Sequence, residues 1–258
     1  MFNNIQEIKT GVFTASLPTG IEVIVKNNVR EDEIRILRLL QDGYHIIRIL
    51  PQADPNLVVM MQEGDDLLSV KELSSSYRHS YTQSIMWIKS MASAVQHCHR
   101  HNIAHMDLSL ENFVISKTSG MPILIDFGLS KSFDPVKRYH INSRQKHVYN
   151  GKEVGKVRFM SPELYRLQPT NAFAHDIYSL GICFLVVVFG LDAHFYNIPD
   201  DARFKFAEFR LREILIYDKI IEPQEVIYDS IIELIQQMIY PQLHRMSISE
   251  VCLCASKI

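Results

Sequence analysis

The sequence predicts an α+β protein with two lobes, a small β-rich lobe followed by a larger, mainly helical one. Two observations carry this prediction. Apolar, β-branched runs separated by turn residues fill residues 1–61, whereas helical periodicity dominates the chain after residue 66. With 258 residues, 47% of them hydrophobic and 22% charged, the chain can bury a sizeable core and resembles an ordinary globular protein in composition.

The small lobe is expected to contain four strands and one helix. Residues 10–26 predict two strands around a turn at Thr19-Gly20, because glycine permits a tight turn and the Val/Ile-rich IEVIVK favours a strand. Residues 31–40 predict a helix, since their apolar side chains recur on one helical face. Two further strands are expected at 45–50 and 56–61.

The large lobe is expected to begin at about residue 67, after a short hinge at about 62–66. Helices are expected around 82–101, 173–191 and 228–240, and short strands near 113–116 and 122–125. The longest apolar run, LGICFLVVVFGL at 180–191, has 12 residues, fewer than the roughly 20 that span a bilayer. It therefore predicts a buried helix and no membrane insertion.

Composition excludes several classes of partner and compartment. The 27 Lys+Arg and 29 Asp+Glu give a net charge of −2, so no general attraction to nucleic acid follows. The N-terminus lacks a basic segment followed by an apolar one, which argues against secretion. Four cysteines are too few for a disulfide framework, so we expect free thiols and a cytoplasmic or nuclear location.

The stretch QHCHRHNIAH at 96–105 is rich in histidine. It invites interpretation as a metal site formed by His97, Cys98, His99, His101 and His105. No second ligand cluster at zinc-like spacing appears elsewhere in the sequence, and a polar helix end explains the stretch more simply.

Three polar residues point to chemistry. Asp107 and Asn112, in HMDLSLENF, are poor residues for a helix or strand interior, yet they lie between apolar runs. Asp126 follows the apolar strand ILI, 14 positions beyond Asn112. Because Mg²⁺ prefers oxygen ligands, Asn112 and Asp126 are candidates to share one divalent cation.

The ordered set of motifs resembles a eukaryotic protein kinase catalytic domain over nearly the whole chain. HMDLSLEN resembles the catalytic loop H-R-D-L-x-x-x-N, DFG at 126–128 the metal-binding turn, and MSPE at 160–163 the end of the activation segment. VIVK at 23–26 resembles the strand that carries the nucleotide-binding lysine. The resemblance implies the bilobal kinase fold, with ATP and Mg²⁺ as cofactors and a protein as substrate.

The resemblance also implies roles for individual residues. Asp107 would accept or orient the proton of the substrate hydroxyl, and Asn112 and Asp126 would hold Mg²⁺ on the nucleotide phosphates. Lys26 would contact the α- and β-phosphates and pair with a helix glutamate, for which Glu33 is favoured.

Alternatives remain open for the lysine–glutamate pair. Glu31 is the second candidate for the partner of Lys26. Lys26 can also be a solvated strand end, and Glu33 an exposed helix charge.

The resemblance places the adenine-facing hinge at Met61, Gln62, Glu63 and Gly64. Met61 aligns with the residue that guards the back of the pocket, and Asp66 is placed to reach the ribose. Either assignment can shift by one or two positions, because QEGDDL is shorter than the usual hinge.

Two further assignments are architectural. Asp176 resembles the buried helix aspartate that braces the catalytic-loop backbone, and Glu163 is expected to pair with Arg245.

The sequence departs from the family in the loop that covers the phosphates. Only Gly11 and Gly20 occur before Lys26, and Gly20 belongs to the later turn. The usual G-x-G-x-x-G cradle is therefore expected to be degenerate, or else the sequence lacks its beginning. Ile24 replaces the alanine that the family places above the adenine. Both changes predict weak nucleotide affinity.

A second departure is Met106, which replaces the arginine that normally receives an activation-loop phosphate. Switching by loop phosphorylation is therefore not expected, although Tyr139, Ser143 and Tyr149 are candidate phosphosites.

In a third departure, Ser109 occupies the position of the lysine that serine/threonine kinases carry two residues after the catalytic aspartate. Lys156 occupies the position of the threonine that this lysine contacts. We hypothesise that Lys156 reaches the Asp107 and γ-phosphate region and replaces the missing ammonium. The alternative is a surface lysine in a basic segment.

That basic segment spans residues 126–163. Its eight Lys/Arg and four Asp/Glu give it a charge of +4. An acidic substrate or partner can dock there; a solvated loop is the alternative.

The leading functional hypothesis is a kinase that phosphorylates a protein hydroxyl. Serine or threonine is favoured because Glu111 stands where tyrosine kinases commonly carry arginine. The alternative is a pseudokinase that acts as a binding scaffold, which the absent glycines and Ile24 favour. A small-molecule kinase fits less well, because MSPEL and the pairing of Glu163 with Arg245 resemble the peptide-substrate branch.

Overall fold

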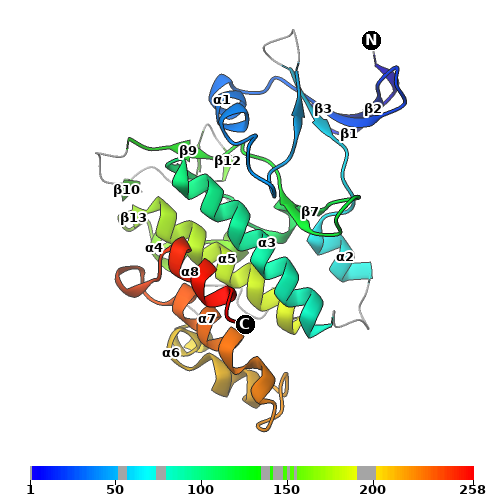
Figure 1. Cartoon of the computed structure of the whole chain (residues 1–258). Coiled ribbons are helices and arrows are strands. Elements are labelled where there is room, and N and C mark those ends of the chain that lie inside the picture. The colour runs from blue at the N-terminus through cyan, green and yellow to red at the C-terminus, as the bar shows by residue number, and fades with distance from the viewer. Residues whose placement is uncertain are drawn as a thin grey trace.

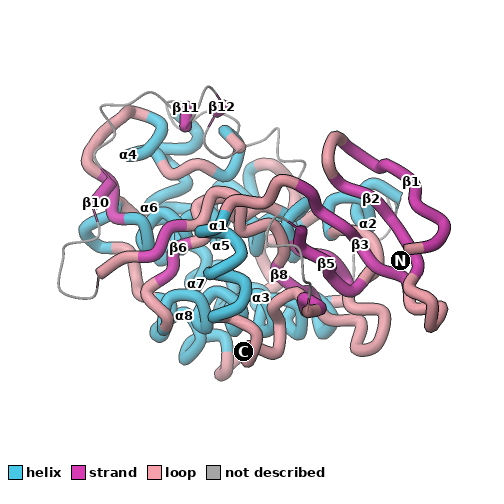
Figure 2. Tube along the Cα trace, turned by 90° about the horizontal axis from the view of Figure 1, so that it is seen from above, coloured by secondary structure: helices cyan, strands magenta, loops and turns pink. Residues whose placement is uncertain are grey.

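The computed structural model describes residues 2–51, 57–73, 80–134, 140–141, 148–149, 152–153, 156–190 and 202–258. Figure 1 shows β1, β2, β3 and α1 above a larger group of helices, with the C-terminus among those helices. Seen from above, β1, β2, β3 and β5 gather on one side of the molecule (Figure 2). The predicted α+β fold with two lobes is confirmed, while the exact residues of the lobe boundaries stay a prediction.

The helices and strands have the following bounds. The strands are β1 (Asn3–Lys9), β2 (Val12–Ser16), β3 (Glu22–Asn27), β4 (Ile49–Leu50), β5 (Leu57–Met61), β6 (Ile103–Ala104), β7 (Phe113–Ile115), β8 (Pro122–Leu124), β9 (Lys131–Ser132), β10 (His140–Ile141), β11 (Val148–Tyr149), β12 (Lys152–Glu153) and β13 (Thr170–Asn171). The helices are α1 (Glu31–Leu39), α2 (Leu67–Leu73), α3 (Tyr81–Arg100), α4 (Pro162–Tyr165), α5 (Ala172–Phe189), α6 (Ala202–Tyr217), α7 (Asp229–Ile239) and α8 (Ile248–Ala255).

A five-stranded antiparallel sheet in the order β1-β2-β3-β5-β4 forms the small lobe. The predicted pair of strands in residues 10–26 is present, and Gly20 has φ +83° in the turn between them. Strand β1 was not predicted. Its residues NNIQEIK are all exposed and lack the alternation that marks a half-buried strand.

The strand predicted at 45–50 is wrong for its first half. Only Ile49–Leu50 joins the sheet, as β4. Ile46 and Ile47 are buried, and Ile46 forms a parallel bridge with Leu124. Backbone bonds join this segment to the large lobe, from Ile47 N to Leu124 O at 3.1 Å and from Leu124 N to His45 O at 2.9 Å. Residues 45–47 of this apolar run therefore pair with Leu124 of the large lobe instead of extending the strand.

Helix α5 occupies the centre of the large lobe and packs against α3 and α7. The Asn171 side chain caps its N-terminus and Gly190, with φ +64°, ends it in the left-handed conformation. Among the described residues, α5 is the one helix long and apolar enough to cross a membrane, but 83% of it is buried inside the molecule. It is thus the buried core helix that the run at 180–191 predicted.

Helix α3 follows the predicted segment 82–101 closely and begins after Ser80, whose Oγ accepts the Gln83 N–H. It carries the single tryptophan, Trp87, which is 6% exposed and donates its indole N–H to Gly120 O at 3.0 Å. The four cysteines are free thiols, as predicted.

Candidate active site

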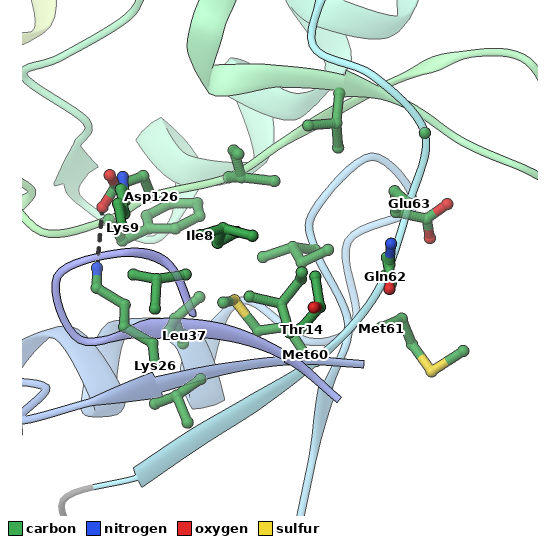
Figure 3. Close-up of a pocket in the computed structure, with 18 of the residues that line it drawn as sticks. Ile8, Lys9, Thr14, Lys26, Leu37, Met60, Met61, Gln62, Glu63 and Asp126 are labelled. Carbon is green, nitrogen blue, oxygen red and sulfur yellow. Dashed lines mark hydrogen bonds and ion pairs between the residues drawn. The ribbon is translucent and has the colours of Figure 1, made fainter. Parts of the chain in front are cut away.

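A cavity of about 590 Å³ lies between the sheet of the small lobe and the segment that leads into the large lobe. Figure 3 shows Lys26, Lys9 and Asp126 at one end and Met61, Gln62 and Glu63 at the other. Its size falls within the range of small-molecule sites, roughly 300–1,000 Å³. The lining residues include Ile8, Lys9, Val12, Thr14, Ile24, Lys26, Glu33, Val58, Met60, Glu63, Gly64, Asp65, Val114, Ile125, Asp126 and Phe127. Ile24 is part of the wall, yet the cavity stays open.

Lys26 is held between two carboxylates from different elements. Its Nζ lies 2.7 Å from Glu33 Oε1 on α1 and 3.1 Å from Asp126 Oδ1 after β8. Glu33 is 5% exposed, whereas Glu31 is exposed at the start of the helix. Of the two candidate glutamates, Glu33 is therefore the one that pairs with Lys26.

Electrostatics keep both members of the Lys26–Asp126 pair charged. Burial alone would lower the pKa of Lys26, but the charges of Asp126 and Glu33 outweigh it and raise that pKa. Burial alone would raise the pKa of Asp126, but Lys26 outweighs it and, with Lys9 and His105, holds the pKa below its usual value. A permanently ionised carboxylate suits a cation ligand.

The backbone of the DFG turn is shaped for this contact. Asp126 has φ +56°, a left-handed conformation that is uncommon for a residue other than glycine. A Cβ on Gly128 would lie 3.2 Å from Asp126 Oδ1, so glycine leaves room for the carboxylate. Phe127 is fully buried and packs edge-on against His105 at 5.0 Å between ring centroids. The turn is thereby anchored beside the catalytic loop.

Asp107 and Asn112 lie beside the cavity rather than among its lining residues, and Ile125 N, one residue before Asp126, donates to Asn112 O at 2.9 Å. Asn112 Nδ2 donates to Asp107 O at 2.7 Å and to Asp107 Oδ2 at 2.9 Å. The other carboxylate oxygen, Asp107 Oδ1, is buried and has no hydrogen-bond partner among the described residues. Burial raises the pKa of Asp107, against the opposing effects of His105, Asn112 and Lys156. An unpaired carboxylate oxygen with a raised pKa is suited to accept a proton.

The donor set fits a divalent cation. The hydrogen bonds of the Asn112 side chain in the described structure are donated by Nδ2, so its Oδ1 is available as a ligand. Asp126 Oδ1 contacts Lys26 and the Gly128 N–H, so Oδ2 remains for a metal. One neutral and one anionic oxygen match the few protein ligands that Mg²⁺ takes.

Asp176 braces the catalytic loop, as predicted. Its buried carboxylate accepts the N–H groups of His105 at 2.8 Å and Met106 at 2.9 Å, and it lies 2.9 Å from His99 Nε2. Met106 has φ +67°. Its side chain is 1% exposed in an apolar cluster with Ala104, Met160, Leu164 and Ala172. Methionine thus fills an apolar pocket at the position where the family has arginine.

Lys156 crosses to the catalytic loop. Its Nζ donates to Ser109 Oγ at 2.9 Å and lies 2.5 Å from Glu111 Oε2. The charge of Lys156 opposes the rise that burial causes in the pKa of Asp107. The pair of exchanged residues, Ser109 and Lys156, is therefore in contact. The sequence did not suggest Glu111 as a partner of Lys156.

The other predicted pair of the large lobe is also present. Arg245 Nη1 lies 2.7 Å from Glu163 Oε1, and Nη2 lies 3.3 Å from Oε2. The Arg245 side chain is 1% exposed, so this is a buried two-point contact.

Met60 and Met61 both line the cavity, but the Met60 side chain is the one on the cavity face. Ile24 and Met60 face each other across β3 and β5, and so do Lys26 and Val58. Because directly opposed residues share one face of a sheet, Met60 lies on the cavity face with Lys26, while Met61 is on the other. Figure 3 shows the Met61 side chain directed away from the cavity. Met61 is therefore part of the cavity wall at the hinge, whereas the side chain placed to guard the back of the pocket is that of Met60.

Asp66 does not line the cavity. Its Oδ1 accepts the Ser69 N–H at 2.9 Å and its Oδ2 the Ser69 hydroxyl at 2.7 Å, so it caps helix α2. Asp65 lines the cavity instead. The assignment of Asp66 to the ribose is therefore corrected, and the helix cap is the physical reason.

Gly64 fixes the hinge to the large lobe. Gly64 N donates to Ile115 O at 2.8 Å, and a Cβ on this glycine would lie 2.8 Å from the same oxygen. Gln62 and Glu63 line the cavity beside it. Only a residue without a side chain permits this approach.

Lys9 and Ile8 are site residues that sequence reasoning missed. Both lie on β1 and line the cavity, and Figure 3 shows Lys9 beside Asp126. A lysine two residues before Gly11, in the part of the chain where the phosphate cradle is expected, was the available signal.

The basic segment 126–163, predicted to dock an acidic partner, lies partly outside the described residues. Lys137, Arg138, Arg144 and Lys146 are among its undescribed cations, as are the candidate phosphosites Tyr139 and Ser143. The proposal of an acidic partner is therefore untested.

Comparison with known proteins gives a consistent result. The family model of the protein kinase domain matches residues 21–254. Calcium-dependent protein kinase 14 of Arabidopsis thaliana is 25% identical over 252 residues, which cover 93% of this chain and 43% of that protein. Myosin light chain kinase 3 of Danio rerio is 23% identical over 190 residues, 72% of this chain and 25% of that protein.

A third relative is the SNF-related serine/threonine-protein kinase of Homo sapiens. It is 24% identical over 164 residues, which cover 61% of this chain and 20% of that protein. The chain spans less than half the length of each of these relatives.

Proposed function

Because the chain belongs to the eukaryotic protein kinase family, we propose that it transfers the γ-phosphoryl group of ATP to a protein hydroxyl, with serine or threonine as the acceptor. The observation that carries this proposal is the assembled ion-pair system at the cavity. Lys26 contacts Glu33 at 2.7 Å and Asp126 at 3.1 Å at the same time. A catalytically competent kinase needs its lysine–glutamate pair and its DFG aspartate in place together.

Each residue then has a defined task. Asp107 Oδ1, buried and without a partner in the described structure, takes the proton of the attacking hydroxyl as its oxygen bonds to the γ-phosphorus. The bond to the bridging oxygen of ADP breaks, and ADP leaves with the electron pair. Lys26 binds the α- and β-phosphates, and Asn112 and Asp126 hold Mg²⁺. Bound Mg²⁺ supplies charge neutralisation on the phosphates.

Lys156 supports the acceptor side of the reaction. It lies against the catalytic loop through Ser109 and Glu111, and its charge opposes the rise that burial causes in the pKa of Asp107. An ammonium about 4 Å from a phosphate charge is worth roughly 4 kcal/mol at an effective dielectric near 20. We infer that Lys156 supplies the charge that serine/threonine kinases place at the position of Ser109.

The choice of serine or threonine rests on two observations. Glu111 replaces the arginine that tyrosine kinases commonly carry before the metal-binding asparagine. One relative, whose alignment covers 61% of this chain, is named a serine/threonine-protein kinase.

A pseudokinase scaffold is the second candidate function. The observation that favours it is the β1–β2 hairpin, which has one glycine, Gly11, where the family has three to cradle the phosphates.

Nucleotide binding and phosphotransfer separate the two candidates. Mg-ATP at millimolar concentration should raise the melting temperature, since a ligand that binds the native state stabilises it by RT ln(1 + [L]/Kd). Transfer of labelled phosphate to a generic acceptor protein should then be measured for the wild type and Asp126→Asn. We expect transfer by the wild type and a loss of at least about 10²-fold in Asp126→Asn. A thermal shift without transfer, or no shift at all, would support the scaffold.

A further inference from the structure

Three potential metal ligands gather at a surface of the molecule away from the nucleotide cavity. His97 and His101 lie four residues apart at the C-terminal end of α3, and Asp42 lies in the turn that follows α1. One ligand nitrogen of each histidine and a carboxylate oxygen of Asp42 all lie within 4.8 Å of one another. In the sequence, no second group of potential ligands accompanies the histidine-rich stretch. In the fold, the carboxylate of Asp42 lies beside the two histidines.

The local bonding prepares His101 to bind a metal. Its Nδ1–H donates to the His97 carbonyl oxygen at 3.0 Å, which fixes the tautomer and leaves Nε2 with a free lone pair. A backbone carbonyl that orients a histidine in this way is the usual outer partner of a metal ligand. The rings of His97 and His101 lie 4.6 Å apart between centroids.

His97 lacks the hydrogen bond that would satisfy it without a metal. Its Nε2 is shielded from solvent and has no hydrogen-bond partner among the described residues; its contact with Asp42 Oδ1, at 3.0 Å, is an ion pair only when the ring is protonated. Buried polar nitrogen normally has a partner, because leaving it unsatisfied costs about 1–3 kcal/mol. An ion bound between the neutral ring and the carboxylate would give His97 Nε2 a partner.

The loop is built to bring the carboxylate to the rings. A Cβ on Gly43 would lie 2.6 Å from His97 Cδ2, so only glycine permits the loop to approach the imidazole this closely. The Asp42 side chain is 74% exposed, whereas that of His97 is 18% exposed. The cluster is therefore open to solvent on the carboxylate side, which provides an entry path and room for a water ligand.

We propose that Asp42, His97 and His101 bind a divalent transition-metal ion of the zinc type. Two imidazoles and one carboxylate match the three protein ligands of many zinc sites, with water in the remaining position. Imidazole ligands favour such ions over Mg²⁺ and Ca²⁺, which prefer oxygen.

The ion would connect the two lobes. Asp42 belongs to the turn between α1 and β4, and α1 carries Glu33, the partner of Lys26. His97 lies in α3 of the large lobe, and His101 is the residue that caps the C-terminus of this helix. Metal binding would restrict the movement of α1 against the large lobe at a point remote from the nucleotide. The inference does not depend on the proposed kinase activity.

Metal binding can be tested on the whole chain. The metal-free protein is titrated with Zn²⁺ in competition with a chromophoric chelator, and with Co²⁺ to record its visible absorption. We expect one tight equivalent for the wild type. Asp42→Ala and His101→Gln should each weaken the affinity at least about tenfold, because each removes one ligand. His244→Gln, which removes an exposed imidazole far along the chain, should bind as the wild type does.

A second measurement covers the case in which one variant folds poorly. Hydrogen exchange of the amides in residues 41–47 should slow when Zn²⁺ is added to the wild type and remain unchanged in Asp42→Ala. Asp42 is exposed, so this substitution should preserve the fold. Equal Zn²⁺ affinity in the wild type and in Asp42→Ala would overturn the proposal, as would the absence of a tight equivalent.

Discussion

The β1–β2 hairpin and the catalytic loop bound the site from the two lobes, and they differ in how they are held. All residues of β1 are exposed, and the hairpin lies at the edge of the sheet. The catalytic loop, residues 105–112, is mostly buried and braced by Asp176. The hairpin carries the largest departure from the family pattern, while the loop keeps Asp107 and Asn112 in mutual contact.

This difference has a physical explanation. In the catalytic loop, the backbone N–H groups of His105 and Met106 depend on the buried Asp176 carboxylate, so a change at that position leaves them unsatisfied. The residues of β1 are exposed, so a substitution there leaves few buried groups without a partner. The hairpin can therefore lose the glycines whose amides bind phosphate and carry a lysine side chain instead. We interpret Lys9, which lies beside Asp126, as a cation that partly compensates for the absent glycines.

Removal of the Asp176 brace should have the largest effect. Asp176→Ala leaves the buried N–H groups of His105 and Met106 without their acceptor, and Met106 is already strained at φ +67°. We expect a loss of at least about 2 kcal/mol in the free energy of unfolding. Chemical denaturation measures it. Asp32→Ala, at an exposed ion pair on α1, should cost less than about 1 kcal/mol. Equal effects would mean that the loop is not held by this brace.

Lys156→Ala should reduce turnover without unfolding the protein. We expect kcat to fall at least about tenfold, because a preorganised cation is lost beside the reacting groups. Lys89→Ala, at an exposed position of α3, is the matched control and should retain full turnover. Similar rates in the two variants would refute the role of Lys156. The double change Ser109→Lys with Lys156→Thr should restore part of the loss.

The pH dependence of the same variant gives a separate prediction. Burial raises the pKa of Asp107, and Lys156 opposes this rise. Since Asp107 must be unprotonated to accept a proton, activity is lost as the pH falls through its pKa. In Lys156→Ala this pKa should be higher, so the acid limb of kcat/KM should move to higher pH. A limb that stays in place would indicate that Lys156 does not act on Asp107.

Lys9→Ala should affect nucleotide binding more than turnover. An exposed cation near a phosphate is worth about 1 kcal/mol in water, so we expect KM for ATP to rise about fivefold with little change in kcat. Lys9→Arg should keep most of the affinity because it keeps the charge. An unchanged KM in Lys9→Ala would show that the hairpin contributes no cation to the site.

The smallest expected changes in the free energy of unfolding come from two glycine substitutions, one in the hairpin and one at the end of the core helix α5. Gly11 and Gly190 both have positive φ, +75° and +64°, and an added Cβ meets no atom closer than 3.8 Å at either position. The strain of alanine there is about 1–2 kcal/mol. Gly190→Ala, at the end of α5, should show this loss in global unfolding. Gly11→Ala should show less, because an exposed hairpin can open locally. Equal losses would mean that the hairpin unfolds with the core.

The residues that carry the chemistry were predictable because their identity and order are constrained by what they bind. Five such candidates were identified from the sequence. The structure brings Lys26, Glu33 and Asp126 into contact, and it brings Asp107 and Asn112 into contact. Helices α1, α3 and α7 were predicted from apolar side chains that recur with helical period, and α5 was predicted from its continuous apolar run. Their catalytic roles remain a proposal.

Features that depend on pairing between strands were not predictable in the same way. The distinction between Met60 and Met61 depends on the register of β3 with β5, which no local pattern encodes. The exposed strand β1 had no apolar face to reveal it, so Lys9 was missed. The capping role of Asp66 could have been predicted from the sequence. Aspartate is a preferred residue directly before a helix, where its side chain accepts an N–H of the first turn, here that of Ser69.

Trp87 is an intrinsic fluorescent probe that reports on one lobe of the molecule. It is the single tryptophan, it is 6% exposed, and its indole N–H is bonded within the large lobe. Intrinsic fluorescence will therefore report the unfolding of the helical lobe. It will change little when only the sheet of the small lobe unfolds. A second tryptophan introduced at Phe13, on β2, would make the two lobes separately visible.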